Sequence, residues 1–230
     1  MLNASTRAVG RRLLLPVMLL SASPPVRLSA QGFLSKFSYD NLKPSALQLD
    51  LGPVGGNNIR GTLTGGLRLD YGFIAPHVRV LVGVSYYKAD FSSAARARFE
   101  QRLRSVVIDP SADDTIRLGR ITWSDVTGDV DLQYVLPQSR AVTAYLGIGL
   151  GAHIRHGSGP AINRTFVQDA LNSITAGLNG TIGTEVGAQR WRFTLEARGV
   201  LSSGVSTASL RSGVMYRWAG GGAKARGTGK

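Results

Sequence analysis

Apolar and polar residues alternate along most of the chain after residue 46. In the segment 62–73, the odd positions are apolar residues or glycine from Leu63 to Phe73, whereas the even positions include Thr64, Arg68 and Asp70. A period of two residues places successive side chains on opposite faces of a β-strand. The pattern therefore predicts strands with one apolar face and one polar face.

Eight such segments follow one another, each of about 9 to 14 residues, the length that a tilted strand needs to cross a bilayer. Their apolar faces begin at Leu47, Leu63, Val78, Val126, Val142, Leu178, Phe193 and Leu210. The segments predict an all-β fold, a single eight-stranded antiparallel transmembrane β-barrel with up-and-down meander connectivity.

The expected connections between strands differ in length. Short turns fall at 74–77, 137–140 and 188–190, whereas the links 92–120 and 155–175 are long. In a transmembrane barrel, short turns face the periplasm and long loops face the cell exterior. The lengths therefore predict which end of the barrel faces which side.

Aromatic residues collect on the apolar parity near the short turns. Such rings are typical of the interface between hydrocarbon and lipid headgroups. We expect a membrane-interface belt of Tyr71, Phe73, Tyr134, Trp191, Phe193, Tyr216 and Trp218.

The opposite, inward parity carries charges of both signs in near balance. A barrel of about eight strands has an interior that side chains fill, so these charges are expected to pair with one another. The expected interior network comprises Arg68, Asp70, Arg79, Asp125, Asp129, Asp131, Glu185, Glu196, Arg198, Arg211 and Arg217.

The two ends of the chain differ from its middle. Three arginines precede the apolar run 13–20, and small residues lead to Ala30, which is the pattern of an export signal. We expect a signal peptide at 1–30, the barrel at 31–218, and a disordered glycine-rich basic tail at 219–230.

Composition excludes several other classes. The basic residues of the leader and the tail reduce the formal charge from +13 to +6 for residues 31–218, and the rest are scattered, so we expect no nucleic-acid partner. The chain contains no cysteine, which excludes disulfides and thiol nucleophiles. The histidines (His77, His153 and His156) are too dispersed for a metal site, and we expect no cofactor.

Taken together, these features resemble the OmpA/OmpX-like family of small outer-membrane barrels, over residues 33–218. The last strand, with Leu210, Val214, Tyr216 and Trp218 at alternate positions, looks like the signal that the family's insertion machinery reads. The resemblance implies an outer-membrane location, with outer-membrane lipid and lipopolysaccharide as partners. The tail is too short for a peptidoglycan-binding domain, so that role does not carry over.

The long links contain two further patterns. Arg96, Arg98, Arg102 and Arg104 interleave with Phe99 and Leu103 as in a basic surface helix, whose arginines suit phosphorylated headgroups. A solvated loop is the alternative. Apolar residues at helical spacing in 162–176 predict a second helix that caps the barrel mouth.

The sequence is compatible with four functions. The first is a non-enzymatic barrel with an envelope-structural or surface-interaction role, and the second is a narrow channel. The third is a lipid A deacylase-like enzyme, because His156 and Ser158 form a His-x-Ser pair. The fourth is a soluble lipocalin-like barrel, which would place the apolar residues inside.

Overall fold

The computed structural model describes residues 42–106, 119–187 and 190–218. The expected signal peptide at 1–30 and the expected tail at 219–230 lie outside these ranges, as does part of the link 92–120.

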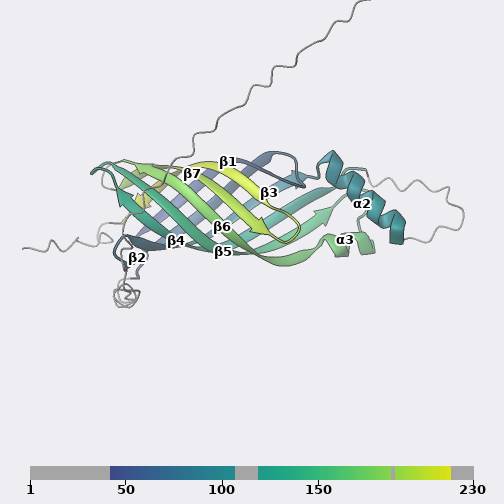
Figure 1. The fold of residues 1–230 in the computed structure, drawn as a ribbon, viewed down its shortest axis with the longest axis horizontal. Helices are drawn as coiled ribbons and strands as arrows, with labels where there is room; N and C mark the ends of the chain where they lie inside the picture. The colour runs from purple at the N-terminus through teal and green to yellow at the C-terminus, as the bar shows by residue number, and fades with distance from the viewer. Residues whose placement is uncertain (1–41, 107–118, 188–189, 219–230) are drawn as a thin grey trace, which may run out of the picture. The chain divides into compact units, whose positions relative to one another are not determined.

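Eight antiparallel strands close into one barrel in meander order, as the alternation predicted (Figure 1). Each strand pairs with its neighbours in sequence, and β8 closes the barrel on β1, for example at Leu49 and Val214. Closure leaves no strand edge unpaired. The strands are β1 (Ala46–Gly56), β2 (Thr62–Ala75), β3 (Val78–Asp90), β4 (Thr122–Pro137), β5 (Val142–Ser158), β6 (Ser173–Val186), β7 (Trp191–Ser202) and β8 (Thr207–Arg217).

Burial alternates along every strand, with the polar face inside. On β4, Asp125, Asp129 and Asp131 are buried, whereas Val126 and Val130 between them are exposed. A soluble lipocalin-like barrel requires the opposite arrangement, so that interpretation is wrong. Apolar side chains do enter the interior in places, since Leu81 and Met215 are fully buried there.

A bulge interrupts the alternation near the end of β2. Gly72 has a φ of 84°, a left-handed conformation that glycine adopts without strain, and the β2–β3 register shifts between Asp70 and Phe73. Phe73 consequently pairs with Arg79, whose side chain is buried inside the barrel. Phe73 therefore does not share the outward face of Tyr71, although the two are two residues apart, and its side chain is half-buried.

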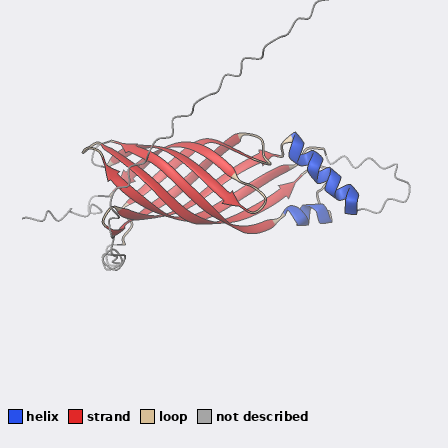
Figure 2. Cartoon of the chain, viewed as in Figure 1, coloured by secondary structure: helices blue, strands red, loops and turns tan. Residues whose placement is uncertain are grey.

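The two ends of the barrel carry different connections (Figure 2). At the turn end, β2 and β3 are joined through Pro76 and His77, and short links also join β4 to β5 and β6 to β7. At the loop end, α2 (Ser93–Val106) follows β3 and α3 (Phe166–Leu171) follows β5. Within the described residues, no helix is long and apolar enough to cross a membrane.

Of the two alternatives for the basic segment, a surface helix and a solvated loop, the structure contains the helix, α2. The second predicted helix is correct only for 166–171, because Asn172 has extended backbone angles and the strand β6 begins at Ser173. Ile174, which the helical spacing included, instead points outward from β6 and is exposed.

A small apolar core joins the two long loops at the loop end. Ile121, Ile162, Val167 and Leu171 are buried together. Phe91 before α2, and Phe99 and Leu103 within it, pack against this cluster. The loops therefore form one packed lobe, here called the loop-end lobe.

Candidate functional site

The centre of the barrel holds a two-pronged ion pair. Arg68 on β2 donates to both carboxylate oxygens of Glu196 on β7 at 2.7 Å, and both side chains are 2% exposed. Tyr145 on β5 donates its hydroxyl to the same carboxylate at 3.1 Å, and Asp50 lies 3.8 Å from Arg68. Side chains from opposite walls thus meet across the interior.

Towards the turn end, a single carboxylate gathers several arginines. Glu185 on β6 is fully buried and lies 2.9 Å from Arg217 and 3.5 Å from Arg192, and it also contacts Arg79. Arg79 further donates to Gln133 at 2.7 and 3.0 Å. Three arginines therefore surround the Glu185 carboxylate, and one of them, Arg79, also lies 3.4 Å from the buried Asp70.

Towards the loop end, an arginine contacts two carboxylates, the reverse of the arrangement around Glu185. Arg198 lies 3.2 Å from both Asp129 and Asp131, and Arg211 lies 3.2 Å from Asp50. One guanidinium here bridges two carboxylates of β4. The interior thus holds clusters of ion pairs at successive heights from the turn end to the loop end.

The interior cluster nearest the loop end includes two side chains from the end of β5, His153 and Arg155. Asp125 accepts from Arg155 at 2.9 Å and lies 3.2 Å from the Nδ1 atom of His153. Arg155 also donates to the carbonyl oxygen of Ser203 at 2.6 Å, which ties the β7–β8 turn to the interior. Arg155 lies in β5 and not in the expected long loop, and the continued alternation of His153, Arg155 and Gly157 is the sequence signal that β5 extends to Ser158.

Glycine on the inward parity gives these long side chains their space. A Cβ at Gly83 would lie 2.8 Å from the Arg68 side chain and 3.0 Å from Asp129. A cavity of about 20 Å³ remains beside His153 and Asn179, room for about one water molecule. The interior is filled rather than open.

The structure brings together the residues predicted for the interior. All are buried inside except Arg217, whose side chain is 30% exposed at the turn end. Nine of the predicted residues form ion pairs with one another, whereas Asp125 and Arg211 pair with Arg155 and Asp50, which lie outside the predicted set. The interior network also includes Gln133, Tyr145, His153 and Arg192.

The predicted aromatic residues other than Phe73 lie on the outer wall at the turn end. Trp191 and Tyr216 have ring centroids 4.8 Å apart, and Trp218 lies 6.3 Å from Tyr216. Phe193 is 70% exposed beside them, and Tyr134 packs near the His77 ring at 5.9 Å. Tyr71 is half-buried, and Phe73 follows the bulge described above.

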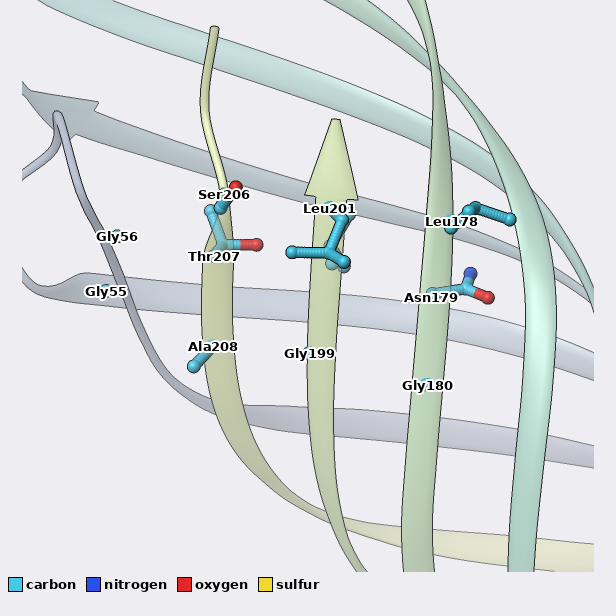
Figure 3. Close-up of a pocket in the computed structure, with 11 residues that line it drawn as sticks. Gly55, Gly56, Leu178, Asn179, Gly180, Gly199, Leu201, Ser206, Thr207 and Ala208 are labelled. Atoms are coloured by element: carbon cyan, nitrogen blue, oxygen red, sulfur yellow. The ribbon is translucent and has the colours of Figure 1, made fainter. Parts of the chain in front are cut away.

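A shallow groove crosses the outer wall where β6, β7, β8 and β1 lie side by side (Figure 3). Its floor is a row of small residues, in which Gly180 pairs with Gly199, Gly199 with Ala208, and Ala208 with Gly55. A Cβ at any of the three glycines would meet no atom within 4 Å. Internal packing therefore does not require glycine on this part of the wall.

A second, polar groove of about 640 Å³ lies on the outer wall at the loop end. It is formed where β2, β3 and β4 meet the lobe, and Arg60, Lys88 and Arg120 line it together with Asp90. Arg120 donates to both oxygens of Asp90 at 3.1 and 3.0 Å. We refer to it below as the basic rim groove.

The His-x-Ser pair has no catalytic surroundings in the described part of the chain. His156 and Ser158 both lie on the outward parity of β5, opposite Ser124 and Thr122 of β4. No hydrogen bond among the described residues orients the His156 ring, so no third member of a triad is present there. The described residues also contain no cluster of three or more histidine and carboxylate side chains that could hold a metal ion.

Comparison with known proteins supports the fold. No family model and no curated protein matches the sequence. Among solved structures, Neisserial surface protein A is similar over 75% of this chain and 96% of its own, with a TM-score of 0.51 and 13% identity. Weaker likeness extends to Ail of Yersinia pestis (TM-score 0.44, 10% identity, 76% of this chain and 99% of that one). It also extends to the N-terminal barrel of OprF from Pseudomonas aeruginosa (TM-score 0.45, 10% identity, 76% and 98%). The chain therefore has the fold of a small eight-stranded outer-membrane β-barrel, the architecture that its resemblance to OmpA/OmpX-like barrels implied.

Proposed function

We propose that this chain is an integral outer-membrane protein with an envelope-structural or surface-interaction role, in which a closed barrel anchors the loop-end lobe at the cell surface. The observation that carries the proposal is the inverted distribution of side chains. Buried ion pairs fill the interior, while large apolar side chains cover the outside.

The outer wall has the chemistry of a surface that contacts hydrocarbon. Ile148, Leu150 and Ile182 are 70%, 66% and 65% exposed, at mid-height on neighbouring strands. A contiguous apolar band of this kind is unfavourable in water and is typical of the lipid-facing wall of a barrel. The aromatic rings at the turn end suit the adjacent headgroup interface.

In this proposal the turn end faces the periplasm and the loop-end lobe faces the exterior, since long loops of such barrels are extracellular. Outer-membrane lipid and lipopolysaccharide are the surrounding partners. The outer-membrane insertion machinery acts during assembly, through the apolar face of β8 that ends near Trp218.

We further propose that the barrel neither conducts ions nor catalyses a reaction. The Arg68–Glu196 pair spans the interior, and a permeating ion would have to separate it within a low-dielectric environment. The cavity of about 20 Å³ near His153 admits no substrate. A narrow channel would need these charges to line a water path instead of one another.

The test is to refold residues 31–230 in detergent and, separately, in plain buffer. We expect β-structure by circular dichroism and a gel band that shifts on boiling only in detergent, and no single-channel conductance in planar bilayers. A stable β-fold in buffer alone would contradict the membrane role, and stepwise conductance would contradict the filled interior. Exclusive recovery of the chain from bacterial outer-membrane fractions would support the location.

A further inference from the structure

The basic rim groove brings three cationic side chains together from separate parts of the chain. Arg60 precedes β2, Lys88 lies near the end of β3, and Arg120 precedes β4. All three are exposed on the outer wall. Asp90 is the only carboxylate among the residues that line the groove.

Backbone contacts fix the position of this groove. The Arg60 amide donates to the Asp90 carbonyl oxygen at 2.8 Å, and the Thr62 hydroxyl donates to the Lys88 carbonyl oxygen at 2.9 Å. These bonds continue the β2–β3 ladder beyond the last paired residues. The cationic side chains thus extend from a rigid rim rather than from a free loop.

The charge of the groove is only partly compensated. The Asp90 carboxylate accepts from Arg120 at 3.0 Å and from the Thr122 hydroxyl at 3.0 Å, so its oxygens are already engaged. Within the described residues, Arg60 and Lys88 take part in no ion pair. Two cationic groups therefore remain available to an anion, while Arg120 is held beside them.

The height of the groove on the wall indicates what anion it meets. Val84, Tyr86 and Lys88 follow one another on the outward parity of β3, and the first two are 47% and 48% exposed. Two residues advance about 6.6 Å along a strand, or about 5 Å along the membrane normal at a tilt of about 40°. The exposed Tyr86 ring at the loop-end edge of the apolar wall suits the headgroup interface there, so Lys88, one step further out, lies at the level of lipid headgroups.

We infer that the basic rim groove binds a phosphate group of a lipid headgroup in the leaflet that surrounds the loop end. Arg60 and Lys88 donate charge-assisted hydrogen bonds to the phosphate oxygens, and Arg120, oriented by Asp90, presents its remaining N–H groups. The inference rests on the proposed outer-membrane role. It favours a lipid over a dissolved anion because the groove opens on the wall directly above the apolar band.

The test uses the full mature chain folded in dodecyl maltoside micelles. Native mass spectrometry measures binding of bis-phosphorylated lipid A, its dephosphorylated form and inorganic phosphate. The variants are Arg60→Gln with Lys88→Gln, and Lys88→Gln alone in case the pair fails to fold. Matched controls are Arg164→Gln, an exposed cation elsewhere at the loop end, and Arg140→Gln at the turn end.

We expect the double variant to bind lipid A at least tenfold more weakly, Lys88→Gln several-fold more weakly, and both controls within twofold of the native chain. The dephosphorylated lipid should bind as weakly to the native chain as lipid A does to the double variant. Native-like binding by the double variant would overturn the inference, and so would displacement of lipid A by an equal concentration of inorganic phosphate. A heat-shifted gel band in every variant would show that the barrels are folded, so that a failure of the lipid-binding inference is read from the binding data alone. Failure of the proposed outer-membrane function would appear differently, as a native chain that folds without detergent.

Discussion

Replacing Glu196 by alanine removes the anion at the centre of the barrel. Arg68 then loses two hydrogen bonds of 2.7 Å while its guanidinium stays 2% exposed, and Tyr145 loses its acceptor at 3.1 Å. Breaking a buried ion pair from one side costs about 3 to 5 kcal/mol, because the remaining charge is left without compensation. Asp50 at 3.8 Å supplies part of that compensation, so we expect a loss near 3 kcal/mol, at the lower end of this range.

The assay is a urea titration of the chain in detergent, followed by tryptophan fluorescence and by the heat-shifted gel band. Replacing both partners, Arg68→Met with Glu196→Met, should recover most of the stability, because removing both charges avoids the unpaired one. The control is Asp90→Asn, which breaks an ion pair at the surface, since the Arg120 side chain is 76% exposed. This variant should change the unfolding midpoint little. A Glu196→Ala variant that unfolds within about 0.5 kcal/mol of the native chain, or a double variant no more stable than the single one, would show that an unpaired Arg68 charge does not destabilise the barrel.

Three further predictions concern the wall and the lobe. Gly180→Ala should leave the stability in the urea titration unchanged or raise it, because a Cβ there meets no atom within 4 Å. Gly183→Ala should destabilise the barrel in the same titration, because a Cβ there lies 2.6 Å from a backbone oxygen and 2.5 Å from Tyr145. Equal effects of the two would contradict the assigned faces of β6. Leu150→Lys, in the middle of the lipid-facing side of β5, should cost about 2 to 4 kcal/mol in lipid vesicles, and a neutral result would argue against a bilayer at that height. Ile162→Ala should loosen the loop-end lobe, where this side chain is fully buried, so limited proteolysis should cut the loops faster while the heat-shifted band persists; loss of that band would mean that the lobe and the barrel unfold together.

The strand faces were predictable because a period of two leaves little choice. Once Leu49 faces outward, Gln48 and Asp50 must face inward, and one apolar face selects the register. The aromatic belt followed from the same parity. The prediction failed locally at Phe73, where the bulge at Gly72 resets the parity without any change in the apolar pattern.

Element boundaries were harder to predict where polar residues continue the alternation. The expected strand ended after His153, and Arg155 looked like a loop residue, because nothing near it in sequence compensates its charge. The charge of Arg155 is compensated by Asp125 on the neighbouring strand, 30 residues away in sequence and in contact only after the β4–β5 pairing forms.

By itself, then, the sequence determined the number of strands, their outward and interior faces and the difference between the two ends, and it left the basic segment of the long loop open between a helix and a solvated loop. These are local properties, set by the alternation of side chains along a strand and the periodicity of a helix. Only the tertiary structure decided which charge meets which, such as Arg68 with Glu196 across the interior, and which cations gather at the basic rim groove. The reason is that ion pairing depends on distance in space, and closure of the barrel brings together residues whose separation along the chain carries no signal of the contact.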